Sequence, residues 1–201
     1  MKKSTSAPPV NHYPNPERTR PMIYEFLNAR PEFDESCFVA PSADVIGDVR
    51  MGRESSIWFQ ATVRADVNYI DIGDRTNIQD NCCVHVTNET APTRIGSQVT
   101  IGHGAVIHGC TIHDRVLVGI QSVILDHAII EPDCMIAAGS LVPPGKTMPS
   151  GHLCMGSPAR PVRRLTDEEI ASLITASDNY VTYLRAYQQK DTYEKNPFYR
   201  R

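Results

Sequence analysis

Three of the seven histidines lie within a short stretch and are the side chains best suited to chemistry: His85, His103 and His108. Imidazole is among the commonest metal ligands in proteins. Three imidazoles that leave one coordination position open are typical of a catalytic zinc site rather than a structural one. The other histidines are expected in turns, on the surface or in the N-terminal segment: His12, His113, His127 and His152.

The chain that carries these histidines repeats with a period of six between residues 39 and 142. Most windows open on a branched aliphatic residue and carry a small residue four places later. This pattern is typical of a parallel β-helix, in which three short strands close one triangular coil. The aliphatics should point into the prism, and the residue near each corner must be small because the backbone turns tightly there. The hexads open at Val39, Val45, Met51, Ile57, Val63, Ile72, Ile78, Val84, Ile95, Ile101, Ile107, Ile112, Val118, Ile124, Ile130, Ile136 and Val142.

Counting hexads places the histidines on the prism. His85 and His108 are each the second residue of a hexad, and two complete hexads lie between theirs. They should therefore share one face on adjacent coils, about 4.7–4.9 Å apart. The same count predicts Arg64 in this column. His103 is the third residue of its hexad and lies around a corner, on the preceding face.

Because His103 lies around a corner from the other two histidines, the three can bind one metal more easily if two chains share it than if a single chain holds it. If triangular prisms pack side by side in a closed trimer, a corner of each subunit meets a face of its neighbour. The metal would then be held by His85 and His108 of one chain and His103 of the next. The alternative is that these outward histidines only form hydrogen bonds across a trimer interface.

Composition indicates one soluble domain with a single good core. The chain has 201 residues, 41% hydrophobic content and a net charge of −3, so nucleic acid is not an expected partner. No apolar stretch approaches the about 20 residues of a membrane span, and the first 21 residues contain no apolar signal segment. We therefore expect no membrane partner and a cytoplasmic location. The six cysteines, without a CxxC spacing, are expected to be reduced core thiols, with Cys110 nearest the candidate site.

The two ends differ from the repeat region. Residues 1–21 contain five prolines among polar and basic residues, which predicts a flexible arm. The sequence Thr166-Asp167-Glu168-Glu169 is a capping box and predicts the start of a helix. Apolar residues after it recur at helical spacing, so this helix should pack along the prism to about Gln188. The expected organisation is an arm over 1–21, the β-helix over 22–164, the helix over 165–190 and a tail over 191–201.

Five short motifs surround the candidate site: Arg64-Ala65-Asp66, Asn77-Ile78-Gln79-Asp80-Asn81, Val84-His85, Ile101-Gly102-His103 and Ile107-His108-Gly109-Cys110. In these motifs the chain resembles the γ-class carbonic anhydrases and their bacterial relatives, and the similarity extends from about residue 22 to 188. The resemblance implies an all-β fold: a left-handed parallel β-helix of hexapeptide repeats with a C-terminal α-helix, assembled as a homotrimer. It also implies metal sites between subunits, occupied by Zn²⁺ or in some members Fe²⁺.

The resemblance assigns a role to each site residue. The three histidines match the metal ligands, and Gln79 matches the residue that positions the metal-bound water or bicarbonate. Arg64 and Asp80 match a pair that links subunits beside the site, with Asp66 supporting it. Asn179, in the predicted helix, matches an asparagine that helps to orient CO2.

The implied activity is the reversible hydration of CO2 to bicarbonate. A metal with an open position lowers the pKa of bound water to about 7, a value for which carbonic anhydrase of another fold is the standard example. Turnover also requires export of a proton through a titratable group. The best-characterised members carry a glutamate directly after the Arg-x-Asp motif and another in a longer acidic loop. Here Val67 takes the first position and residues 86–94 hold only Glu89, so fast hydration is not expected without an external proton carrier.

Two other classes of function remain open. Gly156-Ser157-Pro158-Ala159-Arg160 resembles the turn after the last coil of hexapeptide acyltransferases, in which one histidine acts as a base toward acyl-CoA. An acyl-CoA thioesterase using the same metal site is a nearer variant. Three histidines at metal spacing, and the lack of an acceptor-binding insertion, argue against the acyltransferase. The remaining alternative is a metal-loaded trimer without catalytic activity.

Overall fold

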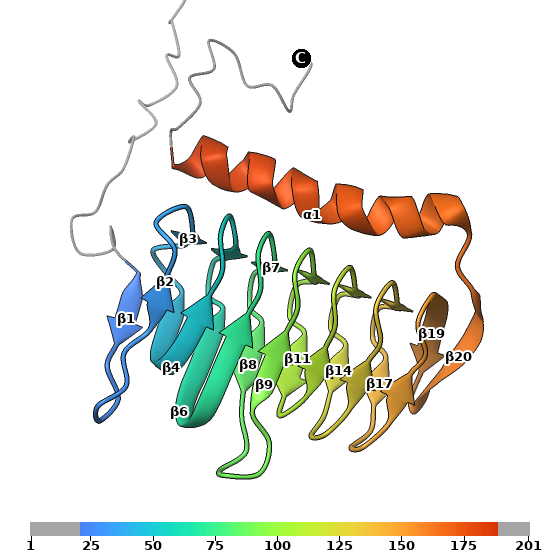
Figure 1. Ribbon diagram of the computed structural model, residues 1–201, viewed down its shortest axis with the longest axis horizontal. Helices are drawn as coiled ribbons and strands as arrows, with labels where there is room; N and C mark the ends of the chain where they lie inside the picture. Colours follow the sequence, from blue (N-terminus) through green and yellow to red (C-terminus); the bar gives the residue numbers. More distant parts are fainter. Residues whose placement is uncertain (1–20, 189–201) are drawn as a thin grey trace, which may run out of the picture.

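Residues 21–188 form a parallel β-solenoid with one long helix beside it, as described by a computed structural model (Figure 1). The fold class predicted from the sequence, a left-handed parallel β-helix of hexapeptide repeats with a C-terminal helix, is confirmed. The structure describes neither residues 1–20 nor residues 189–201, so the predicted arm and tail lie outside the described residues.

The solenoid has three faces, and the strands of each face pair in parallel with the coils before and after. The first face contains the start of β4 (Asp44–Met51) and of β6 (Thr62–Ile72), with β1 (Met22–Tyr24), β8 (Cys83–His85), β11 (Val106–His108), β14 (Val123–Ile124) and β17 (Leu141–Val142). The second face contains the ends of β4 and β6, with β2 (Glu32–Phe33), β9 (Thr93–Ile95), β12 (Thr111–Ile112), β15 (Ile129–Ile130) and β18 (Thr147–Met148). The third face contains β3 (Phe38–Val39), β5 (Ser56–Ile57), β7 (Asn77–Ile78), β10 (Thr100–Ile101), β13 (Leu117–Val118), β16 (Met135–Ile136) and β19 (His152–Gly156). An antiparallel strand, β20 (Ala159–Arg164), pairs with β19 and ends the solenoid.

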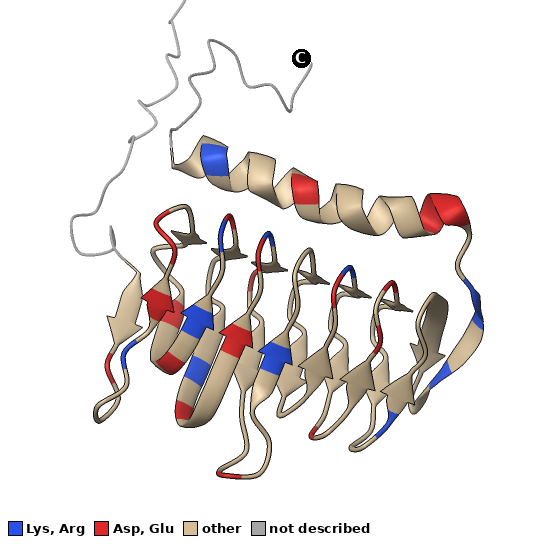
Figure 2. Cartoon of the chain, viewed as in Figure 1, with Lys and Arg blue, Asp and Glu red and all other residues tan. Residues whose placement is uncertain are grey.

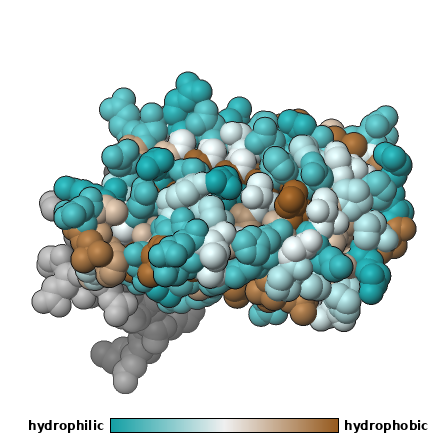
Figure 3. All heavy atoms as spheres, turned by 60° about the horizontal axis from the view of Figure 1, so that its bottom comes forward, coloured by the Kyte–Doolittle hydropathy of each residue, from teal (hydrophilic) through white to brown (hydrophobic). Residues whose placement is uncertain are grey.

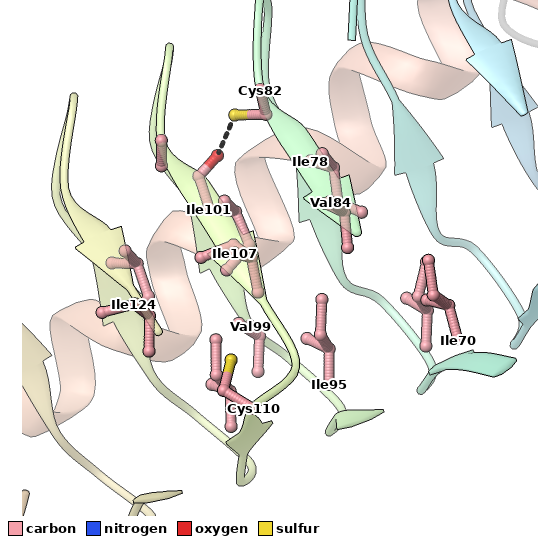
Figure 4. Close-up of a cluster of buried hydrophobic side chains, with 14 of the residues drawn as sticks. Ile70, Ile78, Cys82, Val84, Ile95, Val99, Ile101, Ile107, Cys110 and Ile124 are labelled. Carbon is pink, nitrogen blue, oxygen red and sulfur yellow. Dashed lines mark hydrogen bonds between the residues drawn. The ribbon is translucent and has the colours of Figure 1, made fainter. Parts of the chain in front are cut away.

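The core is a stack of inward aliphatic side chains from successive coils (Figure 4). Ile78, Ile101 and Ile107 are fully buried, as the hexapeptide pattern predicts for the residues that open each hexad. The small residues near the corners are also buried, including Ala43, Ala61, Ala105 and Ala128. All six cysteines are free; four are buried, whereas Cys37 is half-buried and Cys83 is exposed on β8.

Helix α1 (Asp167–Tyr187) begins at the predicted capping box. The Glu169 amide donates to the Thr166 hydroxyl at 3.2 Å, and the Thr166 amide donates to the Glu169 carboxylate at 2.9 Å. Acidic residues occupy the first turn and Arg185 the last, which suits the helix dipole (Figure 2). The helix runs back along the solenoid, where Leu173, Ser177, Val181 and Leu184 are buried. Its C-cap, Gln188, donates a hydrogen bond to the Cys37 carbonyl at 2.7 Å.

On the face that Figure 3 brings forward, apolar side chains form separate small groups among polar residues. Within residues 21–188 no helix is long and apolar enough to cross a membrane.

Strand β15 offers a direct test of the predicted inward and outward alternation. Ile130→Ala should lower the free energy of unfolding by about 2–5 kcal/mol, because it opens a cavity at a fully buried position. Ile129→Ala, on the neighbouring half-buried position, should cost clearly less. Urea unfolding followed by circular dichroism measures both variants. An equal loss in the two would contradict the core assigned here.

Candidate metal centre

His85 and His108 face each other on adjacent coils of the first face. The register pairs them directly across β8 and β11, as the hexad count predicts. Nδ1 of His85 lies 3.1 Å from Nε2 of His108, and the ring centroids are 5.1 Å apart. The two outward imidazoles therefore form one local site.

The outer nitrogen of each ring is held by a carboxylate. Nε2 of His85 lies 3.0 Å from Oδ1 of Asp66, and Nδ1 of His108 lies 2.5 Å from Oδ1 of Asp126. Asp126 also accepts a hydrogen bond from the Thr87 hydroxyl at 2.6 Å, and Asp66 pairs with Arg64. The order Asp66, His85, His108, Asp126 follows four successive coils of the first face.

Both carboxylates are stabilised in their ionised form. Partial burial alone would raise the pKa of Asp66, but hydrogen bonds from His85 and Arg64 outweigh it and lower the pKa below its ordinary value. At Asp126 burial is likewise outweighed, by hydrogen bonds from Thr87 and His108, and its pKa is lowered. Ionised carboxylates only accept hydrogen bonds, so each neutral imidazole must place its N–H toward its aspartate.

This arrangement fits a metal ion. The two ring nitrogens left over, Nδ1 of His85 and Nε2 of His108, then present lone pairs to each other at 3.1 Å. Facing lone pairs repel unless a proton or a cation lies between them. Two imidazole nitrogens bound to one tetrahedral zinc at 2.0–2.1 Å would be about 3.3 Å apart. A carboxylate on the far nitrogen of each ring is also the usual support of histidine metal ligands.

His103 lies elsewhere within the same chain. It follows β10 on the third face, where its Nδ1 pairs with Asp80 Oδ2 at 2.9 Å and its amide donates to Gln79 Oε1 at 3.2 Å. Its side chain is 46% exposed. Within residues 21–188 of one chain, no three histidine, cysteine or acidic side chains are grouped so that they could hold a metal. A single chain therefore supplies two of the three predicted ligands at one place and the third at another.

Gln79, His103 and Asn179 line one cavity of about 550 Å³ between α1 and the third face. Gln79 is 6% exposed, and its Nε2 donates to Asn77 at 3.1 Å, so its amide is fixed on both sides. Asn179 reaches the same cavity from the helix. Of the predicted catalytic residues, these two share a cavity with His103, whereas Arg64 and Asp66 lie beside the His85–His108 pair.

Three residues near the motifs can be placed more simply. Cys110 points into the core and is 1% exposed, and burial raises its pKa to about 12, so its thiol lies on the opposite side of the sheet from the outward imidazoles (Figure 4). Val67 is 42% exposed on β6, directly after Asp66. Glu89 is exposed in the turn between β8 and β9.

Sequence reasoning missed Asp126 and Thr87. Asp126 is the third residue of the hexad opened by Ile124, one coil beyond His108 on the same face. Continuing the hexad count by one coil would have found it. Gly109 makes the contact possible, since a Cβ there would lie 2.6 Å from Asp126 Oδ1, and its φ of +55° also favours glycine.

Comparisons with known proteins match the repeat region and most of the chain. The family described as bacterial transferase hexapeptide (six repeats) matches residues 109–144. The mitochondrial gamma carbonic anhydrase 2 of Arabidopsis thaliana is 46% identical over 175 residues, 85% of this chain, which spans 63% of that relative's length. A carbonic anhydrase of Geobacillus kaustophilus is 40% identical over 85% of this chain and 95% of its own length.

A solved structure shares the fold across nearly its whole length. The hexapeptide transferase family protein of Anaplasma phagocytophilum matches with a TM-score of 0.80 and 40% identity, over 83% of this chain and 98% of its own. Sequence and structure thus agree over the solenoid that carries the histidines. The chain belongs to the γ-class carbonic anhydrase-like family of hexapeptide-repeat proteins.

Proposed function

We propose that this protein is a metal-dependent carbonic anhydrase that hydrates CO2 reversibly at sites between the subunits of a homotrimer. The observation that carries the proposal is the His85–His108 pair, in which two ring nitrogens face each other at 3.1 Å and an aspartate lies on each far nitrogen. Family membership supports the same activity. A cytoplasmic location is proposed with it, on the sequence alone.

The metal ligands would be His85 and His108 of one subunit and His103 of the next. A divalent metal held by three imidazoles lowers the pKa of a coordinated water to about 7 and so supplies a nucleophile at neutral pH. Asp66 and Asp126 hold the first two rings in the tautomer that coordinates, and Asp80 does the same for His103. Three nitrogen ligands suit either Zn²⁺ or Fe²⁺.

The substrate side of the site would be formed by Gln79 and Asn179. Both line the cavity beside His103, and Gln79 is held rigidly by its two hydrogen bonds. Arg64 is 42% and Asp80 33% exposed at the side chain. Each therefore keeps surface free to form the proposed pair between subunits.

Mixed trimers test the shared site. His103→Ala and His108→Ala homotrimers should each lose most of their metal, because every site lacks one ligand. Refolded together, a trimer that contains both variants should regain one complete site of three. Metal content by mass spectrometry of anaerobically purified protein, with mass by light scattering, measures this and distinguishes zinc from iron.

No recovery in mixed trimers would contradict the shared site. A metal-loaded monomer would also contradict it. Retention of metal by either homotrimer would show that the altered histidine is not a ligand.

Asp126→Asn should weaken metal binding about 10–100-fold, because the amide no longer fixes the His108 tautomer with a negative charge. Asp74→Asn is the matched control, since Asp74 pairs with Arg53 at a distant corner. Competition with a chromogenic chelator measures both. Equal affinities for the two variants would remove Asp126 from the site.

Val67→Glu tests the missing proton carrier. Wild-type hydration should be slow in dilute buffer and should rise with concentrated imidazole, which carries the proton instead. The variant should gain most in dilute buffer, because it adds a titratable group beside Asp66 without touching the ligands. Stopped-flow CO2 assays measure this.

Glu89→Ala is the control for the shuttle. If the wild type is already fast in dilute buffer and Glu89→Ala abolishes that speed, Glu89 is the shuttle. If fully metallated trimers show no hydration under any of these conditions, the protein is a metal-binding trimer without this activity.

A further inference from the structure

Within one chain, the cavity beside His103 is far larger than CO2 requires. Its volume of about 550 Å³ lies within the range of sites for whole organic ligands, roughly 300–1,000 Å³. It is a groove between α1 and the third face that extends from β10 to β19, three coils onward.

The floor of the groove changes in character along its length. One outward position of the third face runs through Thr100, Leu117, Met135 and Leu153 in direct register. Thr100 is buried and bonded to Asn77 at 3.0 Å, whereas the three apolar residues that follow are only half-buried. The helix therefore covers the polar part of the row closely and leaves the apolar part accessible.

The roof is a second stripe of the same helix. The stripe at Leu173, Ser177, Val181 and Leu184 packs on the solenoid. The adjoining stripe lines the groove with Ala176, Asn179, Tyr180 and Tyr183. Burial, with a smaller contribution from nearby Asp80, raises the pKa of Tyr180 to about 12 and keeps its hydroxyl neutral. Polar groups thus gather at the His103 end, and apolar side chains line the rest.

We propose that this groove binds an acyl group, with its carbonyl or carboxylate at Gln79 and Asn179 beside His103 and its apolar chain over Leu117, Met135 and Leu153. The inference rests on the same site as the proposed function and extends its substrate class to carboxylic acids and their esters or thioesters. A polar head of one or two oxygens matches the few polar groups at one end. A straight chain matches an apolar row that follows the solenoid axis.

Calorimetric titration of the metal-loaded trimer with acetate, butyrate, hexanoate and octanoate tests this proposal. Affinity should rise with chain length, by up to about fourfold for each buried methylene. Ala176→Phe, which fills the groove from the helix, should reduce octanoate affinity at least tenfold and leave acetate binding unchanged. Ala171→Phe is the matched control on an exposed position of the same helix outside the groove, and it should bind octanoate as the wild type does.

Affinity independent of chain length, or an equal loss in both phenylalanine variants, would overturn the proposal. Absence of octanoate binding in a trimer that hydrates CO2 would also overturn it, because the neighbouring subunit would then fill the groove. Chain-length-dependent binding in a trimer that does not hydrate CO2 would support the groove and contradict the proposed function.

Discussion

The parallel register between successive coils is the constraint on which the rest of the structure depends. Each strand pairs with its equivalent one coil away, so a given position of the repeat recurs at one strand spacing along the solenoid. The inward aliphatics fix this register, because a slip of one residue would turn every buried Ile or Val outward. The His85–His108 pair is a direct product of that register, as is the row of residues that forms the groove floor.

Electrostatics favour a cation between the stacked imidazoles that we propose as metal ligands. Asp66 and Asp126 lie on the coils that flank the pair and draw both N–H groups outward, which leaves two lone pairs facing each other. In a partly buried setting such uncompensated groups are costly, since the low local dielectric strengthens their repulsion. A shared proton or a bound metal ion would remove that cost. The carboxylates therefore do more than hold the two rings in place. They also favour a positively charged species between the two facing ring nitrogens.

Much of this could be predicted from the sequence, because the repeat converts position in the chain into position in space. The stacked histidines and the start of α1 follow from that count and from the capping box. Continuing the count by one coil also reaches Asp126, but its contact with His108 depends on the missing side chain at Gly109, which periodicity does not reveal. The sequence predicts Asp66 only as support for the pair formed by Arg64 and Asp80, yet its carboxylate also contacts the His85 ring. The meeting of His103 with the other two ligands remains a prediction, since it requires a second chain.

The contacts that fix the helix on the solenoid also set the shape of the groove. Its C-terminal half is anchored by an aromatic cluster, in which the ring centroid of Trp58 lies 5.3 Å from those of Tyr180 and Tyr187. It is also anchored by the hydrogen bond that the Gln188 side chain donates to the Cys37 carbonyl. Its N-terminal end is held beside β20 by an exposed pair between Arg163 and Glu169, and exposed pairs contribute little to stability. The position of the helix over the groove is thus set by this aromatic packing near the first coils together with the buried stripe at Leu173, Ser177, Val181 and Leu184. The width of a cavity at the candidate site therefore depends in part on Trp58 and Tyr187, which do not line that cavity.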